Sequence, residues 1–230
     1  MQEVRVFVMP GKLLTLLDHR SALRISSNVT RNIRQLQGRT KVDIPPREVI
    51  KILNKARIKF TLVGAHGIAG WLVDPRASQD VDVIIHAQHK KAVQAIRKAF
   101  PELPVMDLEV VTRFIDPATD RPVIDLMRPD SALHQNVADY TVQVGKTHRI
   151  PSLEMALALK FAAIQSPHRK EIKKHQDAVD FESMVVAHGE EIDEDVLFSL
   201  GEMVKNSGGK EILELVEEAR AESGSQGEQD

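Results

Sequence analysis

The pattern of apolar and polar positions changes character near residue 151. Before it, short runs rich in Val, Ile and Phe alternate with Gly, Pro and Asp, a pattern typical of strands joined by turns and short helices. After it, apolar residues recur at three- and four-residue spacing, which predicts helices, and Ser152 is the expected N-cap of the first one. The expected strands cover 59–63, 81–85, 108–115, 121–127, 140–144 and 147–150, and the expected helices cover 46–56, 64–72, 90–99, 152–164, 170–187, 193–205 and 210–221.

The two ends of the chain have weaker patterns. Residues 4–8 alternate like a short strand, residues 12–17 predict one or two helical turns, and residues 21–38 are polar and rich in Arg. The basic stretch has two interpretations, an arm that contacts RNA or a partner and a solvated face. Residues 223–230 contain no apolar side chain and are expected to be disordered.

Together these elements predict an α+β fold, with a small mixed β-sheet core followed by a C-terminal helical bundle. The expected division is an N-terminal extension of uncertain structure (1–44), a core (45–150), a helical region (151–222) and a disordered tail (223–230).

Composition narrows the class of protein. The 230 residues are 42% hydrophobic and 28% charged, which is ordinary for a globular protein. The net charge of -2 means that any contact with nucleic acid needs a local basic patch. The absence of Cys excludes disulfides, thiolate metal sites and a cysteine nucleophile. No export signal or membrane-length apolar run is visible, so we expect a cytoplasmic protein with no membrane contact.

Asp80 and Asp82 are the first candidates for chemistry. They flank Val81 at the start of a predicted strand, so both carboxylates are expected on one face, roughly 6.6 Å apart. Two like charges at this spacing repel each other, and a shared divalent cation would remove the conflict. The alternative is an edge strand whose outer face is simply charged.

The order of motifs resembles the nucleotidyltransferases of the DNA polymerase beta superfamily. Val63-Gly64-Ala65 resembles the first part of their signature, Asp80-Val81-Asp82-Val83 the acidic part, and Val123-Ile124-Asp125-Leu126 the later strand with a third acidic residue. Within that superfamily the chain is most similar to the AbiEii-like abortive-infection toxins. That likeness lies in the helical segment 151–160 and in Asp177-Ala178-Val179-Asp180.

The resemblance implies a reaction and its components. Asp80, Asp82 and Asp125 would hold Mg²⁺ or Mn²⁺ and act as the catalytic residues. The protein would transfer a nucleoside monophosphate from an NTP to a hydroxyl of an acceptor, which could be RNA, tRNA, a protein or a small molecule. An antitoxin-like partner is a further implication.

The residues expected to bind the nucleotide lie in both halves of the chain: Gly64, Ala65, His66, Arg76, Ser78, Lys160 and Asp177. Ala65 departs from the Gly or Ser usual at this position, which favours the alternative of a non-catalytic nucleotide- or partner-binding module. Lys160 either faces the nucleotide or packs its stem and leaves its ammonium in water. Asp177 and Asp180 lie one helical turn apart and could pair with Lys160 or Arg169.

Overall fold

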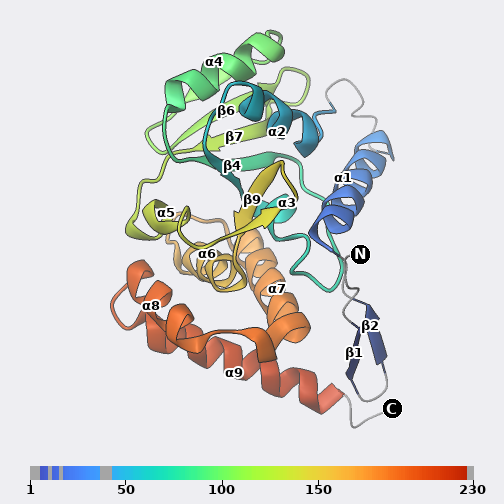
Figure 1. The fold of residues 1–230 in the computed structure, drawn as a ribbon, viewed down its shortest axis with the longest axis vertical. Coiled ribbons are helices and arrows are strands. Elements are labelled where there is room, and N and C mark those ends of the chain that lie inside the picture. The colour runs from blue at the N-terminus through green and yellow to red at the C-terminus, as the bar shows by residue number, and fades with distance from the viewer. Residues whose placement is uncertain (1–5, 10–11, 16–17, 37–42, 227–230) are drawn as a thin grey trace. The chain divides into compact units, whose positions relative to one another are not determined.

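A computed structural model describes residues 6–9, 12–15, 18–36 and 43–226 of the chain. The fold is α+β, as the sequence predicts, and it consists of two compact units. The sheet unit contains His19–Ala69 and Pro75–Pro151 (Figure 1). Of the described residues, the helical unit contains those up to Asp18, the short segment Gly70–Asp74 and those from Ser152 onward.

In the described part of the chain, the sheet unit is built on a mixed seven-stranded sheet with the order β5-β6-β7-β4-β3-β9-β8. Two of its neighbouring pairs are parallel, β4 with β7 and β3 with β9, and the others are antiparallel. The strands are β3 (Phe60–Leu62), β4 (Val81–Ile85), β5 (Val105–Asp107), β6 (Val111–Asp116), β7 (Arg121–Met127), β8 (Thr141–Val144) and β9 (His148–Pro151). Its fully buried side chains include Leu62, Ile84, Phe114, Ile124 and Leu126.

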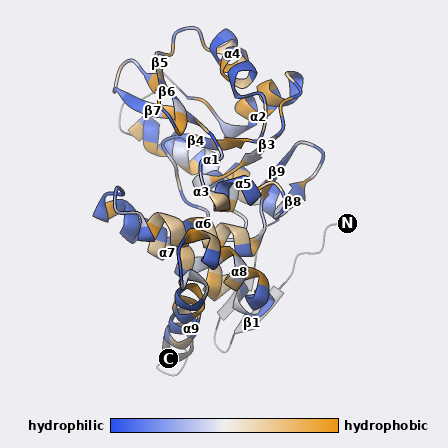
Figure 2. Ribbon diagram, turned by 90° about the vertical axis from the view of Figure 1, so that its left-hand side faces the viewer, coloured by the Kyte–Doolittle hydropathy of each residue, from blue (hydrophilic) through white to orange (hydrophobic). Residues whose placement is uncertain are grey.

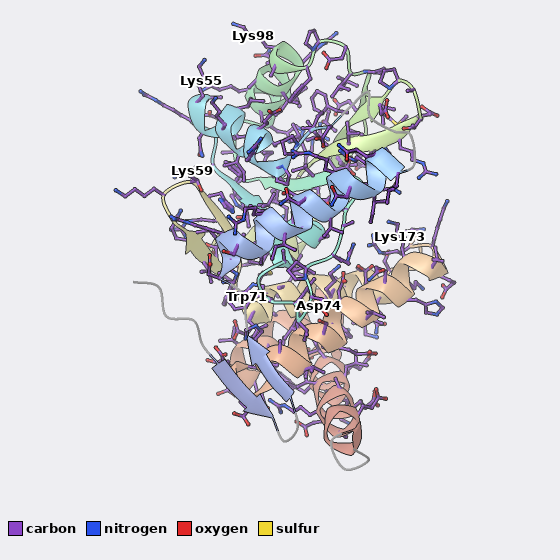
Figure 3. The ribbon with its side chains drawn as sticks, turned by 90° about the vertical axis from the view of Figure 1, so that its right-hand side faces the viewer. Lys55, Lys59, Trp71, Asp74, Lys98 and Lys173 are labelled. Carbon is purple, nitrogen blue, oxygen red and sulfur yellow. The ribbon has the colours of Figure 1, made fainter. Side chains whose placement is uncertain are left out.

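Helices of five or more residues belong to the same unit as this sheet. They are α1 (His19–Leu36), α2 (Pro46–Lys55), α3 (Gly64–Ile68), α4 (His89–Ala99) and α5 (Ala132–Asn136). Helix α1 crosses in front of the strands of its unit in Figure 3, while Lys55, Lys59 and Lys98 project away from that unit. The buried residues of α1 recur every fourth position, which places them on one face of the helix: Ala22, Ser26 and Thr30.

The helical unit has its core on α6 (Leu153–Gln165). This helix is mostly apolar (Figure 2) and contacts α7 (Glu171–His188) and α8 (Glu194–Val204). Its N-terminus is capped as predicted, because Ser152 Oγ accepts a hydrogen bond from Met155 N. The unit also contains the 3₁₀ turn Gly189–Glu191, α9 (Gly208–Gln226) and an antiparallel pair of strands, β1 (Val6–Met9) and β2 (Lys12–Thr15).

Most predicted elements are present, and four expectations need correction. Residues 12–15 form a strand and not a helical turn, because they pair with β1. The helix expected over 64–72 ends at Ile68, and the chain passes into the helical unit at Gly70. Strand β5 and helices α1 and α5 were not expected. Helix α9 continues to Gln226, past the expected start of the disordered tail, and residues 227–230 lie outside the described residues.

Among the described helices, none combines the length and the apolar character that a bilayer span requires.

Candidate metal centre

Three carboxylates converge where strands β4 and β7 run side by side. Asp82 on β4 and Asp125 on β7 are register partners in this parallel pair, and Asp80 immediately precedes β4. One oxygen from each of the three side chains lies within 4.8 Å of the other two. Residues widely separated in sequence are therefore brought together by the pairing of two neighbouring strands.

Asp125 is the most buried of the three, with 8% of its surface exposed. Its Oδ2 accepts a hydrogen bond from Arg113 Nε at 3.2 Å, whereas its buried Oδ1 has no hydrogen-bond partner among the described residues. Burial raises the pKa of Asp125 to about 6, with Asp80 adding to the rise and Arg113 opposing it. The charged form of this carboxylate is thus incompletely compensated by the protein.

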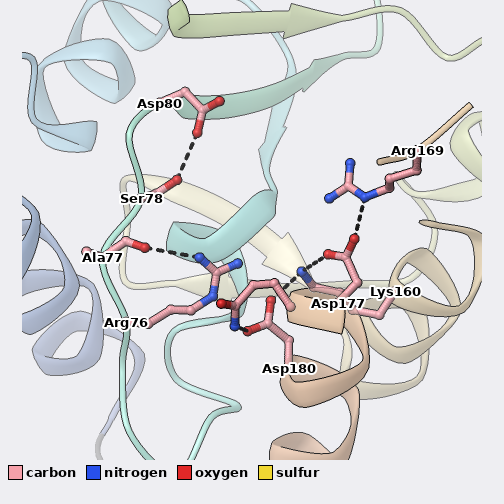
Figure 4. A network of polar contacts seen from close by, with 9 residues as sticks. Arg76, Ala77, Ser78, Asp80, Lys160, Arg169, Asp177 and Asp180 are labelled. Carbon is pink, nitrogen blue, oxygen red and sulfur yellow. Dashed lines mark hydrogen bonds and ion pairs between the residues drawn. The ribbon is translucent and has the colours of Figure 1, made fainter. Parts of the chain in front are cut away.

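Asp80 is held by the loop that leads into β4. Ser78 Oγ donates a hydrogen bond of 2.8 Å to Asp80 Oδ1 (Figure 4). The backbone N–H of Ser78 donates in turn to Thr30 Oγ1 on α1, at 3.0 Å. Ser78, expected from the sequence to bind the nucleotide, thus has its hydroxyl hydrogen-bonded to an acidic residue of the site.

Gly64 lies against the carboxylate of Asp82. Its φ of +61° is a left-handed conformation that favours glycine, and a Cβ at this position would come within 2.1 Å of Asp82 Oδ2. The residue before Gly64 is also linked to β4, because Val63 N donates to the carbonyl oxygen of Asp82 at 2.9 Å. The turn between β3 and α3 is therefore matched to the acidic strand by both its conformation and its lack of a side chain.

Ala65 and His66, both expected near the nucleotide, have buried side chains in the sheet unit. His66 Nδ1 lies 2.9 Å from Ser26 Oγ on α1. Burial lowers the pKa of His66 to about 3, and the charges of Arg34 and Arg76 lower it further. The imidazole is therefore neutral at neutral pH and has a partner inside the protein; its contact with a nucleotide stays a prediction.

Arg76 begins the loop before Asp80. Its carbonyl oxygen accepts a hydrogen bond from Ser26 Oγ at 2.6 Å, and its Nη1 donates to the carbonyl oxygen of Ala77 at 3.0 Å (Figure 4). The predicted contact with a nucleotide concerns the Arg76 side chain and stays a prediction. The structure shows that the Arg76 backbone helps to hold the loop.

Lys160 and Asp177 lie in the helical unit, in a buried ion-pair cluster. Lys160 Nζ is 2.8 Å from Asp177 Oδ1 and 2.5 Å from Asp180 Oδ2 (Figure 4). Arg169 Nε pairs with Asp177 Oδ2, and Gln176 Nε2 donates to Asp180 Oδ1 at 3.2 Å. The pairing among these residues is the one considered from the sequence. The alternative of a Lys160 ammonium in water is wrong, because the residue is only 7% exposed.

Sequence reasoning missed four residues that contact the acidic strands or their loop: Ser26, Thr30, Arg34 and Arg113. The first three recur every fourth residue in a stretch interpreted only as polar and Arg-rich, and this spacing was the available signal. Arg113 faces Asp125 across the β6–β7 pair, a register that the hairpin prediction did not fix.

Among known proteins, the chain is similar only to solved structures. No protein-family model and no curated protein sequence matches the chain. An antigenic nucleotidyltransferase-like protein from Paracoccidioides brasiliensis is 18% identical, with a TM-score of 0.43 over 70% of this chain and 77% of that one. JHP933 from Helicobacter pylori is 15% identical, with a TM-score of 0.47 over 78% and 90%.

A third solved structure is ANT(2")-Ia in complex with adenylyl-2"-tobramycin. It is 15% identical, with a TM-score of 0.47 over 67% of this chain and 93% of that one. Likenesses at this level carry no argument about the activity of this chain. The geometry of the chain's own residues is what bears on its activity.

Proposed function

We propose that this protein is a divalent-metal-dependent nucleotidyltransferase that moves a nucleoside monophosphate from an NTP to a hydroxyl of an acceptor. One observation carries the proposal: oxygens of Asp80, Asp82 and Asp125 lie within 4.8 Å of one another, and a buried oxygen of Asp125 has no partner among the described residues.

The three carboxylates fit Mg²⁺ or Mn²⁺. Both cations prefer hard oxygen ligands, and Mg²⁺ sites use one or two carboxylates together with the phosphates of a substrate. A bound cation would satisfy Asp125 Oδ1 and lower the cost of keeping three carboxylates ionised together. In this chemistry the metal neutralises charge on the transferred phosphoryl group and favours the ionised form of the attacking hydroxyl.

The residues around the triad have distinct parts in this proposal. Asp80, Asp82 and Asp125 hold the cation, and Arg113 fixes the orientation of Asp125 through its Oδ2. Gly64 leaves the space that the Asp82 carboxylate occupies. The sequence resemblance leaves the acceptor open among RNA, tRNA, a protein and a small molecule, and an antitoxin-like partner is likewise an implication of the resemblance.

A second candidate is a nucleotide- or partner-binding module without turnover. The observation in its favour is Ala65, which supplies no hydroxyl where the resembled family has Gly or Ser and which is only 3% exposed. The intact acidic triad favours the enzyme over this alternative.

Label transfer separates the two candidates. The purified protein is incubated with each α-labelled NTP, Mg²⁺ or Mn²⁺, and total RNA or a protein extract. We expect transfer by the wild type and a loss of orders of magnitude in Asp82→Asn, because one ligand of the cation is removed. Asp139→Asn, an exposed change in the same unit, is the matched control and should transfer like the wild type. NTP binding without transfer to any acceptor would favour the module.

A further inference from the structure

A polar stripe on α1 holds the loop that precedes Asp80. Three residues of α1, spaced four positions apart and therefore on one face of the helix, form hydrogen bonds to the backbone of this loop. Ser26 Oγ donates to the carbonyl oxygen of Arg76 at 2.6 Å, and Thr30 Oγ1 accepts from the N–H of Ser78 at 3.0 Å. Arg34 Nη2 donates to the carbonyl oxygen of Gln79. Three successive turns of α1 therefore engage three residues of the loop 76–79.

The stripe is an unusual choice for the buried face of a helix. Ser26 and Thr30 are 0% and 7% exposed, and hydroxyl side chains inside a helix are neutral to unfavourable for its stability. The Thr30 hydroxyl donates its hydrogen within the helix, to the carbonyl oxygen of Ser26 at 2.8 Å. A lone pair of the same oxygen remains, and it accepts the hydrogen bond from the loop residue Ser78. An apolar face would leave the loop backbone without these partners.

Hydrogen bonds through the loop 76–79 connect α1 to the acidic site. It has no helical or strand hydrogen bonding of its own between Pro75 and Asp80 in the described structure. The N–H of Ser78 donates to Thr30 Oγ1, and the Ser78 hydroxyl donates to Asp80 Oδ1 at 2.8 Å. From the other side, Arg121 Nη1 on β7 donates to Gln79 Oε1 at 3.2 Å. The carboxylate of Asp80 is thus located through Ser78 and Gln79, both of which are held by neighbouring elements.

The surroundings of Arg34 support the same arrangement. Burial lowers the pKa of the Arg34 guanidinium, and the charges of Asp43, Asp80 and Asp116 oppose this effect. The guanidinium therefore lies within the electrostatic field of Asp80 while its Nη2 holds the preceding peptide group.

We propose that α1 is a positioning element for the metal site, in which Ser26, Thr30 and Arg34 fix the loop 76–79 so that the Asp80 carboxylate is held beside Asp82 and Asp125. This inference rests on the proposed function in requiring the triad to bind a cation. Groups that orient metal ligands typically change metal affinity by about 10- to 100-fold when they are removed. Loss of the Thr30 hydroxyl is expected to weaken binding by about tenfold.

Three substitutions on one helix test the proposal. Thr30→Val keeps the β-branched shape and removes the acceptor of the Ser78 N–H. Thr30→Ser keeps that acceptor and serves as the rescue variant. Ser27→Ala is the matched control, because Ser27 Oγ bonds to the carbonyl oxygen of Leu23 within α1. Mn²⁺ affinity is measured by titration of the metal-free protein, well below the thermal midpoint of each variant, and hydrogen exchange reports on the amides of residues 76–80.

The expected result is faster exchange over 76–80 and about tenfold weaker Mn²⁺ binding in Thr30→Val, with Thr30→Ser and Ser27→Ala close to the wild type. Unchanged exchange overturns the contact between helix and loop. Faster exchange with unchanged Mn²⁺ affinity shows a purely structural role for α1 and overturns the positioning. The proposed function fails separately, if wild-type Mn²⁺ binding is absent or is the same in Asp82→Asn; that result also removes the basis of the positioning role.

Discussion

The acidic triad and the Lys160 cluster both bring carboxylates together, and each contains buried ones, but they differ in how the oxygens of the buried carboxylates are satisfied. In the helical unit, both oxygens of Asp177 and both oxygens of Asp180 have a donor, supplied by Lys160, Arg169 or Gln176. In the sheet unit, Oδ2 of Asp125 has Arg113, whereas its buried Oδ1 has no partner among the described residues.

This difference separates a structural cluster from a candidate ligand set. A buried charge costs free energy unless it is paired and hydrogen-bonded. The Lys160 cluster meets that requirement within the protein, so its role in the fold needs no external ion. Asp125 does not, and its pKa of about 6 reflects the same deficit. A cation from solution would therefore lower the free energy of the protein more by binding at the triad than at the Lys160 cluster.

The largest effect is expected from Lys160→Met. The substitution keeps much of the side-chain volume but leaves Asp177 and Asp180 buried without the ammonium that both contact. Removing one partner of a buried ion pair costs about 3–5 kcal/mol, which urea unfolding would detect as a lower midpoint. Lys173→Met, an exposed change on α7, should stay within about 0.5 kcal/mol of the wild type. A Lys160→Met midpoint equal to that of the wild type would show that the cluster contributes nothing to stability.

Gly64→Ala should disturb the triad through its nearest neighbour. The left-handed φ of +61° costs a non-glycine residue about 1–2 kcal/mol, and the close approach to Asp82 adds an overpacking cost of about 1–3 kcal/mol. Gly145→Ala is the control, since φ is +56° there and the added Cβ meets the flexible end of Arg20. Urea unfolding should find Gly64→Ala less stable than Gly145→Ala. Equal losses would mean that Asp82 moves aside without cost.

Metal and nucleotide should act on the wild type and not on Asp82→Asn. With Mg²⁺ and NTP at 100 times their apparent Kd, the wild type gains about 2.7 kcal/mol by mass action. Without metal, Asp82→Asn should melt at or above the wild-type temperature, because one of three converging carboxylates loses its charge. Melting curves of both proteins with EDTA or with Mg²⁺ and NTP measure the difference. Equal stabilisation of the two proteins would exclude Asp82 as a ligand.

A final effect, of similar size, is a dependence on pH in metal-free protein. Since the pKa of Asp125 is raised to about 6 in the fold, the folded state binds the proton more tightly than the unfolded state. The resulting stabilisation is complete below about pH 4 and is lost as pH rises to about 6, by on the order of 2–3 kcal/mol. The stability of the wild type relative to Asp125→Asn should therefore fall over this range in EDTA. A constant difference would place Asp125 at its ordinary pKa.

The sequence was informative wherever one local pattern decides the structure. The convergence of Asp80 and Asp82 could be predicted because their spacing has the strand period, although β4 begins only at Val81. Ser152 could be assigned as a cap because its hydroxyl satisfies a nearby N–H. The partnership of Lys160 with Asp177 followed from helical spacing and from the cost of burying an unpaired charge.

Long-range contacts account for what the sequence did not provide. The role of Thr30 depends on which face of α1 meets the loop 76–79, and local periodicity does not identify that partner. The Arg113 contact depends on the register of β6 against β7, where the pairing shifts between Phe114 and Ile115. The extended form of residues 12–15 is set by β1, because strand pairing overrides weak helical preference.

The path of the chain between its two units limits how the protein can be divided. The segment Gly70–Asp74 leaves the sheet unit, contributes to the helical unit and returns. Trp71 packs edge-on against His188 with ring centroids 5.3 Å apart, and Val73 N donates to Ser183 Oγ at 3.1 Å. A fragment starting at Ser152 lacks both contacts. The helical unit is therefore not an exchangeable module that can be cut off or swapped at a single point; a chimera has to carry residues 70–74 with it.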